Sequence, residues 1–180
     1  MSSGNEHQLV VLVDENDNQV GTADKLEAHM HGGKLHRAFS IFVFNSKGET
    51  LLQKRAMGKY HSAGKWSNTC CSHPLVGESV IEAAHRRLKE EMGFDCDLAE
   101  QFHFIYKTDV GNGLTEWEYD HVLFGRYDGE PILNSEEASD YKYVSLEELR
   151  SSIASAPDQY TPWLRICINQ VIDAYQKLNG

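Results

Sequence analysis

The 180-residue sequence has no long hydrophobic run and too little positive charge to balance its acids. No apolar run approaches the roughly 20 residues that a membrane-spanning helix needs, and the first residues lack the basic and apolar regions of a signal peptide. The 17 Lys and Arg residues face 27 Asp and Glu residues, which gives a formal charge of −10. This balance argues against nucleic acids and anionic membrane surfaces as partners. By itself it also disfavours small anionic ligands.

Cysteine is scarce as well, with four in the chain. The adjacent Cys70 and Cys71 are poor partners for a disulfide, and a chain of this length can build a hydrophobic core without covalent staples. Reduced, reactive or metal-bound thiols fit better, so we expect a cytoplasmic protein. The length and the 41% hydrophobic content fit one domain over residues 1–180, with residues 1–7 as a flexible N-terminus and a monomer as the default state.

Short β-branched and aromatic runs, interspersed with amphipathic stretches, predict an α+β fold with a mixed or antiparallel sheet flanked by helices. We expect strands at 8–13, 37–45, 49–55, 102–106, 116–127 and 141–144, and helices over 79–92, after Ser145 and from Thr161. The strands 37–45 and 49–55 flank a short turn and form a predicted hairpin. Residues 58–74, rich in Gly, Ser, Asn, Cys and His, form a predicted loop of a length that is usually functional.

The predicted helix over 79–92 carries a dense pattern of acids and bases. Arg87 and Glu91 lie one turn apart and face the same side of the helix. A carboxylate in that position can bind a hard divalent cation, and the cation can bind a diphosphate oxygen. The alternative is a solvated face of alternating charge, which the helix taken alone favours.

Histidine is abundant, with nine in the chain. His29 and His36 flank a glycine-containing loop, and His73 follows Cys71 by two positions. Neutral imidazoles are common ligands for Zn, Mn and Fe, so these three histidines are candidate metal ligands. His31 is an alternative to His29. We expect incidental surface or core positions for the other five, which are His7, His61, His85, His103 and His121.

Two acids open the predicted strand at 116–127. Glu116 and Glu118 are two residues apart, so both carboxylates point to one face while Trp117 points to the other. With three histidines they would complete a five-ligand set of nitrogen and oxygen atoms. The alternative is a solvated strand end on which the two acids repel each other, and the strand alone leaves both interpretations open.

Cys71 lies in the polar loop, which favours a reactive thiol over a small buried residue. Cys96 and Cys167 do not supply the second ligand pair that a structural zinc site would show, and we expect them to be buried.

These segments together resemble the type I isopentenyl-diphosphate isomerases, the metal-dependent branch of the Nudix superfamily. The resemblance extends from about residue 8 to about residue 170 and is carried by KLEAH at 25–29, LHRAFS at 35–40, LQKR at 52–55, WSNTCCSHP at 66–74, TEWEYDH at 115–121 and YTPW at 160–163. The helix is similar to the Nudix box, with two departures. Ser72 stands where the box begins with Gly, and Arg87 stands where the hydrolases carry a glutamate.

The resemblance implies the interconversion of isopentenyl and dimethylallyl diphosphates by proton addition and removal, an isomerase reaction of isoprenoid biosynthesis. It implies Cys71 and Glu118 as catalytic residues, with Tyr106 supporting the acid. It implies a site for one divalent metal, Mn²⁺ or Zn²⁺, built from His29, His36, His73, Glu116 and Glu118. It implies a diphosphate-bridging Mg²⁺ on Glu91, and substrate contacts from Lys25, Ser40, Arg55, Lys59, Arg87 and Trp163. If these cations converge on one site, that site can bind an anionic ligand although the net charge of the chain is negative.

Two other functions remain open at this point. A Nudix hydrolase that cleaves a nucleoside diphosphate derivative fits the helix, but Arg87 in place of the glutamate and the histidines count against it. A metal-binding interaction domain without activity fits the histidines, but leaves Tyr106, Cys71 and Glu118 unexplained.

Overall fold

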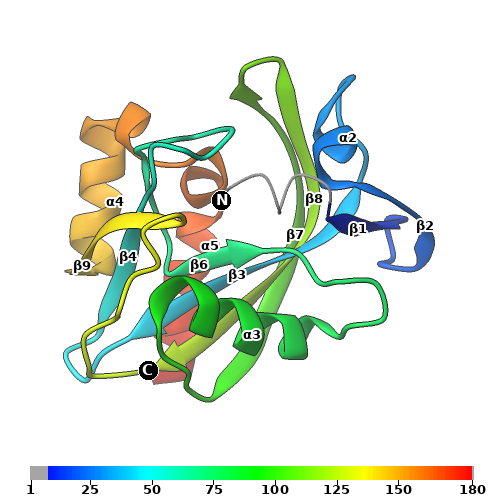
Figure 1. Ribbon diagram of the computed structural model, residues 1–180. Helices are drawn as coiled ribbons and strands as arrows, with labels where there is room; N and C mark the ends of the chain where they lie inside the picture. Colours follow the sequence, from blue (N-terminus) through cyan, green and yellow to red (C-terminus); the bar gives the residue numbers. More distant parts are fainter. Residues whose placement is uncertain (1–7, 180) are drawn as a thin grey trace.

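The computed structural model describes residues 8–179, so the predicted flexible stretch 1–7 lies outside the described residues. Within this range nine strands form one hydrogen-bonded sheet (Figure 1). The strands are β1 (Leu9–Val13), β2 (Gln19–Asp24), β3 (His36–Phe44), β4 (Glu49–Arg55), β5 (Trp66–Ser67), β6 (Cys70–Ser72), β7 (Leu98–Gly111), β8 (Leu114–Arg126) and β9 (Ala138–Ser145). The helices are α2 (Lys25–His29), α3 (Val80–Met92), α4 (Leu146–Ser155) and α5 (Pro162–Asn179), with a 3₁₀ turn at Pro157–Gln159.

The central strand is β3, and its two edges are paired differently. One edge pairs in parallel with β8 over the whole strand, from His36 opposite Glu118 to Phe44 opposite Arg126. The other edge pairs antiparallel with three strands in succession, which are β1, β6 and β4. The predicted mixed sheet is therefore confirmed, and the long strand β7 adds to its far side by antiparallel pairing with β8.

The predicted hairpin of β3 and β4 exists only near its turn. Phe44 and Thr50 pair, but the two strands then separate and the β5–β6 segment enters between them. Thr69 bridges the gap, because its hydroxyl accepts from the Val43 N–H at 2.9 Å and donates to the Leu51 carbonyl at 2.6 Å. The prediction of an uninterrupted loop over 58–74 is wrong for the same reason, since the segment contains two short strands.

Helix boundaries follow the capping signals in the sequence. The Ser79 hydroxyl accepts from the N–H of Glu82 at the start of α3, and Gly93 ends this helix with φ +72°. A Cβ at Gly93 would lie 2.4 Å from the Ile132 carbonyl oxygen, so glycine is required there. Ser145 caps α4 in the same way as Ser79 caps α3. The sequence pattern did not predict the short helix α2 or the strand β2.

Two apolar clusters lie on opposite faces of the sheet, and Figure 1 shows α3 in front of it and α5 behind it. Leu88 and Met92 of α3 pack against Ile41 on one face. Leu164, Ile168 and Val171 of α5, which recur at helical spacing, pack on the other. Leu178, near the end of α5, is 58% exposed. No helix among residues 8–179 is long and apolar enough to cross a membrane.

We predict that Thr69→Val lowers the free energy of unfolding by about 1–3 kcal/mol, because the buried Val43 N–H and Leu51 carbonyl would both lose their partner. Thr69→Ser keeps the hydroxyl and should lose less than half as much. Urea unfolding monitored by circular dichroism measures both values. Equal stability of the valine variant and the wild type would show that the bridge does not hold the separated strands.

Candidate active site

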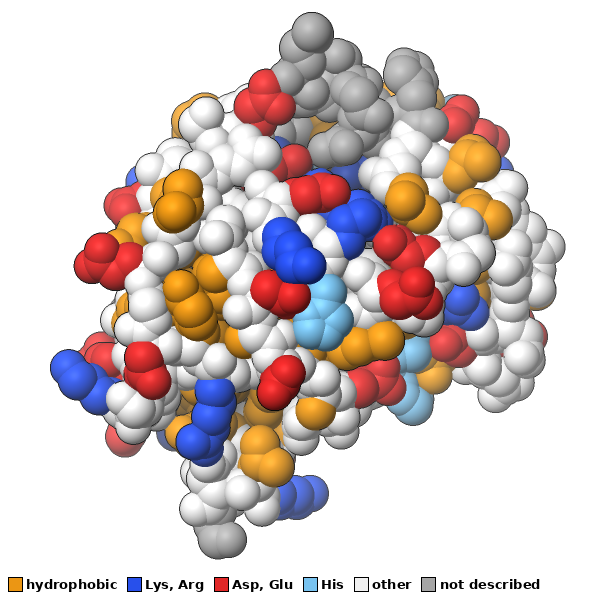
Figure 2. Space-filling model, turned by 60° about the horizontal axis from the view of Figure 1, so that its bottom comes forward, with side chains coloured by type: hydrophobic (Ala, Val, Ile, Leu, Met, Phe, Trp, Pro, Cys, Tyr) orange, Lys and Arg blue, Asp and Glu red, His pale blue; other side chains and the backbone are white. Residues whose placement is uncertain are grey.

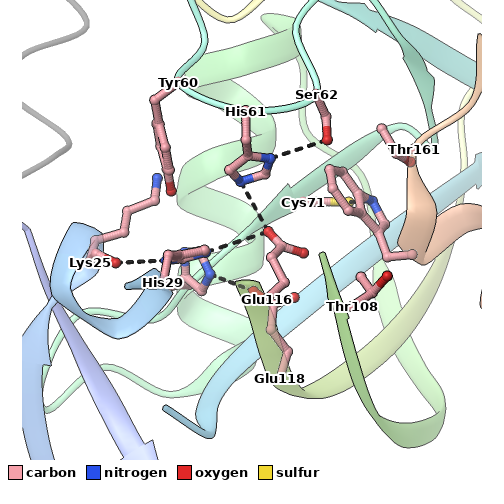
Figure 3. Close-up of polar contacts among 12 residues, drawn as sticks. Lys25, His29, Tyr60, His61, Ser62, Cys71, Thr108, Glu116, Glu118 and Thr161 are labelled. Atoms are coloured by element: carbon pink, nitrogen blue, oxygen red, sulfur yellow. Dashed lines mark hydrogen bonds and ion pairs between the residues drawn. The ribbon is translucent and has the colours of Figure 1, made fainter. Parts of the chain in front are cut away.

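A cavity opens where β3 and β4 separate, and it gathers residues from distant parts of the sequence. Figure 3 shows the side chains converging from α2, the loop after β4, β6, β8 and the start of α5. Nine of the predicted site residues line it: Lys25, Arg55, Lys59, Cys71, His73, Arg87, Glu116, Glu118 and Trp163.

Three predicted metal ligands contact one another, and two of them, His73 and Glu118, belong to the cavity lining. Nε2 of His73 lies 2.8 Å from Oε2 of Glu118, and Nε2 of His36 lies 3.1 Å from the same oxygen. The two imidazole nitrogens are 3.2 Å apart. With His29, these groups bring four donor atoms within 4.8 Å of one another, all on buried residues.

The remaining ring nitrogens of two histidines are fixed by the backbone. Nδ1 of His29 donates to the Lys25 carbonyl at 2.7 Å, and Nδ1 of His36 donates to the Lys34 carbonyl at 2.8 Å. Each Nε2 is thereby left with a free lone pair, the arrangement that metal-ligating histidines show. Nε2 of His29 is buried and has no hydrogen-bond partner within residues 8–179. An orphaned imidazole nitrogen beside two further imidazoles and a carboxylate fits a borderline divalent metal such as Zn²⁺ or Mn²⁺.

Glu116 and Glu118 both face the cavity, as the two-residue spacing in β8 predicted. Tyr106, on the paired strand β7, places its hydroxyl 2.5 Å from Oε2 of Glu116 and in short contact with Oε1 of Glu118, so that its one proton lies between the two carboxylates. Burial raises the pKa of Tyr106, and the two carboxylates raise it further, so the phenol keeps its proton. Tyr106 thus serves as a fixed donor between the two acids.

The charge state of these carboxylates follows from their neighbours. Burial and the proximity of Glu116 would raise the pKa of Glu118, but the contacts from His36 and His73 outweigh them and lower it to about 2. Burial would likewise raise the pKa of Glu116, but His61 and His29 hold it well below its usual value. Burial lowers the pKa of His73 to about 3 against the pull of Glu118, which keeps this imidazole neutral. Ionised carboxylates and neutral imidazoles are the forms that bind metals.

Cys71 lies on β6, on the opposite edge of β3 from the glutamates of β8. Its thiol donates to Oδ1 of Asn68 at 2.9 Å, and the indole N–H of Trp163 donates to its sulfur at 3.0 Å. Burial raises the pKa of Cys71, so the thiol is protonated in this structure. The indole donor is already in place to stabilise sulfur when it loses that proton.

Four cationic side chains belong to the cavity lining, namely Lys25, Arg55, Lys59 and Arg87. Glu137 lies among them, 2.7 Å from Nζ of Lys59 and 3.2 Å from Nη2 of Arg87. Nε of Arg55 and Nε of Arg87 are buried without a hydrogen-bond partner in the described part of the chain. Unpaired guanidinium donors beside two ammonium groups fit a small multivalent anion. The acidic surplus is dispersed instead, and Figure 2 shows acids and bases interspersed over one face of the surface.

Five predicted site residues lie outside the cavity lining, which are His29, His36, Tyr106, Glu91 and Ser40. Glu91 is buried behind Arg87, where its Oε2 accepts from Nη2 of Arg87 at 2.8 Å and its Oε1 accepts from Gln53 at 3.0 Å. Ser40 lies behind Cys71, 3.6 Å from the sulfur, and donates to Asp120 at 2.8 Å. The structure therefore does not bring Ser40 to the place where a diphosphate would contact it.

Four of the other histidines, His31, His85, His103 and His121, lie outside the cavity lining. His31 is exposed and does not compete with His29. His85 pairs with Asp95, and His103 stacks on Tyr119, both outside the cavity lining. His121 lies between Asp17 and Glu100, also outside it, and His7 lies outside the described residues.

His61 was predicted to be incidental, and the structure corrects this. It is buried in the cavity lining, with Nε2 at 3.1 Å from Oε1 of Glu116. Burial lowers its pKa, which keeps the ring neutral despite the neighbouring carboxylate. Its position in a loop without periodicity gave no signal, except that it lies in the polar segment 58–74 that already favoured function.

Comparisons with known proteins show the family of this chain. A family model described as NUDIX domain matches residues 34–164. The chain is 56% identical over 175 residues to Isopentenyl-diphosphate Delta-isomerase 2 of Photorhabdus laumondii, which covers 95% of this chain and 98% of that protein. It is 48% identical over 167 residues to the Isopentenyl-diphosphate Delta-isomerase of Pectobacterium atrosepticum, covering 93% of each chain.

Solved structures show the same fold at low sequence identity. A crystal structure of a Deinococcus radiodurans protein matches with a TM-score of 0.77 at 20% identity, covering 91% of this chain and 98% of that one. The MutT protein of Methanosarcina mazei matches with a TM-score of 0.65 at 20% identity, covering 81% and 96%.

We predict that Lys25 takes up a proton when an anion binds among the four cations. Burial, then repulsion from Lys59, Arg87 and Arg55, lowers the pKa of Lys25 to about 7, and a bound anion would raise it again. Above pH 7, binding should therefore absorb on the order of one proton, and affinity should fall by up to about tenfold for each further pH unit.

Calorimetric titration with inorganic diphosphate at pH 8, in two buffers of different ionisation enthalpy, measures this uptake. In Lys25→Gln the binding enthalpy should no longer differ between the two buffers as it does in wild type. Lys177→Gln, on the exposed end of α5, should keep the wild-type difference. The same proton uptake in wild type and Lys25→Gln would refute the assignment.

Proposed function

Because this chain belongs to the NUDIX family, and within it to the isopentenyl-diphosphate Delta-isomerases, we propose a mechanism that assigns the reaction to its own residues. The chain is an enzyme that interconverts isopentenyl diphosphate and dimethylallyl diphosphate in isoprenoid biosynthesis. The nucleotide hydrolase and the metal-binding module without activity are therefore set aside. The observation that carries the mechanism is that Cys71 and Glu118 line one cavity from the two strands that flank β3.

The reaction requires one proton to be added to the terminal alkene carbon and another to be removed from the carbon on the diphosphate side. We assign these transfers to Cys71 and Glu118, acting on opposite faces of the alkene. Since the reaction runs in both directions, each group donates in one direction and accepts in the other. The resting pair shares one proton, which the raised pKa of Cys71 and the lowered pKa of Glu118 place on sulfur.

The passing positive charge needs stabilisation and protection from water. The indole of Trp163 is 3% exposed and lies in contact with the sulfur of Cys71. A π face beside a tertiary cation contributes about 0.5–2 kcal/mol of attraction. Tyr106 holds the Glu118 carboxylate in place by its hydroxyl, which fixes the position at which the proton is exchanged.

We assign the tightly held metal, Mn²⁺ or Zn²⁺, to His29, His36, His73, Glu116 and Glu118. When bound, this metal supplies positive charge that tunes the acidity of the Glu118 carboxyl group. The protein residues supply the rest, since Tyr106 contacts Oε1 of Glu118 while the imidazoles of His36 and His73 lie 3.1 Å and 2.8 Å from Oε2.

The diphosphate is assigned to Lys25, Arg55, Lys59 and Arg87, whose charges converge on the cavity. Glu91 would hold a Mg²⁺ ion, and as a single buried carboxylate it could do so only together with further oxygen ligands. Such an ion, when bound, supplies further charge compensation for the diphosphate. The four side chains orient the five-carbon tail, so that binding energy at the diphosphate positions the alkene between Cys71 and Glu118.

We also propose that the whole chain 1–180 is a single catalytic domain that works as a monomer in the cytoplasm, with no nucleic acid or membrane partner. The four cysteines are free, which suits a reducing compartment.

We predict that Cys71→Ala and Glu118→Gln each lower the rate of isomerisation by at least about 10²–10⁴-fold, because each removes one of the two proton-transfer groups. Proton NMR of isopentenyl diphosphate conversion measures the rate, and circular dichroism measures the fold.

The controls are Cys96→Ala, a thiol outside the cavity, and Glu130→Gln, an exposed acid. Both should keep wild-type turnover, and all four variants should keep the wild-type spectrum. Near-normal conversion by Cys71→Ala or by Glu118→Gln would end the assignment.

A further inference from the structure

His61 is a buried histidine that the metal assignment above does not use. Its ring is 4% exposed, and Nε2 lies 3.1 Å from Oε1 of Glu116 (Figure 3). We propose that His61 is a positioning residue of the metal site, which donates from Nε2 to Glu116 and fixes this carboxylate toward His29. The inference rests on the metal site proposed above.

The neighbouring residue determines which ring nitrogen carries the proton. Oγ of Ser62 lies 3.2 Å from Nδ1 of His61, and Ser62 has φ +52°, a left-handed conformation that costs free energy in a residue with a side chain. When the Ser62 hydroxyl donates to Nδ1, the proton of a neutral ring sits on Nε2, opposite Glu116. The strained backbone of Ser62 thus places a hydroxyl where it selects the tautomer that can donate to the carboxylate.

The two oxygens of Glu116 are then held from two sides. Oε2 accepts from Tyr106 at 2.5 Å, and Oε1 lies 3.1 Å from His61 and 3.5 Å from Nε2 of His29. A carboxylate held at both oxygens loses little freedom when a metal binds. Outer hydrogen bonds of this kind orient metal ligands, and their loss typically lowers metal affinity 10–100-fold.

The geometry argues against a second, independent metal between His61 and Glu116. The two groups of candidate ligands share His29, whose Nδ1 already donates to the Lys25 carbonyl. One free nitrogen cannot serve two ions, and without it His61 and Glu116 would provide only two ligands. A hydrogen bond from His61 to Glu116 uses the same atoms without that conflict.

The backbone of His61 is held from the diphosphate side of the cavity. Nη2 of Arg55 donates to the His61 carbonyl at 3.1 Å, and the His61 ring meets the Trp163 ring edge-on at 5.9 Å between centroids. His61 is therefore the link between the cations assigned to the diphosphate and the carboxylate assigned to the metal.

The test measures the affinity of the purified protein for Mn²⁺, by competition with a chromophoric chelator, and needs no turnover. His61→Phe keeps the ring volume without the donor and should lower Mn²⁺ affinity about 10–100-fold. His61→Gln carries an amide N–H near the position of Nε2 and should restore affinity to within about fivefold of wild type. Ser62→Gly suits the left-handed backbone but lacks the hydroxyl, and should weaken binding by a smaller factor.

His85→Phe is the matched control, since this imidazole also contacts a carboxylate, Asp95 at 2.6 Å, but outside the cavity. It should leave Mn²⁺ affinity unchanged, and thermal unfolding of the metal-free proteins checks that each variant folds. Wild-type affinity in His61→Phe would overturn the inference, and so would an equal loss in His61→Gln and His61→Phe, which would mark His61 as a direct ligand. His36→Ala tests the metal site itself: if this variant binds Mn²⁺ like wild type, the proposed metal site is wrong.

Discussion

Two buried carboxylates, two residues apart on one strand, are the constraint on which this site depends. Glu116 and Glu118 are 4% and 6% exposed, and an uncompensated buried charge is strongly destabilising. Around them the fold places histidines from α2, β3, the loop after β4 and the end of β6, together with a tyrosine from β7. The same groups that stabilise the buried carboxylates form the set that suits a divalent metal.

The geometry of the proposed active site arises from the unequal edges of β3. Continuous parallel pairing with β8 fixes His36 opposite Glu118, while the separation of β3 from β4 admits β6 and brings Cys71 opposite Ser40. A regular hairpin of β3 and β4 would close this space. Thr69 supplies the hydrogen bonds that the separated strands no longer give each other, so the opening does not leave these two backbone groups unpaired.

Features that depend on local chemistry could be predicted from the sequence. The caps at Ser79 and Ser145, the end of α3 at Gly93 and the shared face of Glu116 and Glu118 all follow from spacing within one element. The separation of β3 and β4 could not be predicted, because it depends on hydrogen bonds between Thr69 and two residues, Val43 and Leu51, that lie 26 and 18 positions away in the sequence. His61 was missed because its role comes from a contact with Glu116 across the cavity. The net charge of −10 misled for a related reason: a total does not show that four cations converge on one cavity.

The central claim is that the double bond moves by addition of one proton and removal of another, both exchanged by residues of this chain. The most direct test incubates isopentenyl diphosphate with the metal-loaded enzyme in deuterium oxide and follows the products by mass spectrometry and NMR. The account predicts dimethylallyl diphosphate that carries solvent deuterium in a methyl group, because the groups that deliver the proton re-equilibrate with solvent between turnovers. Product that forms at the full rate without deuterium would show an internal hydrogen shift and would contradict the account.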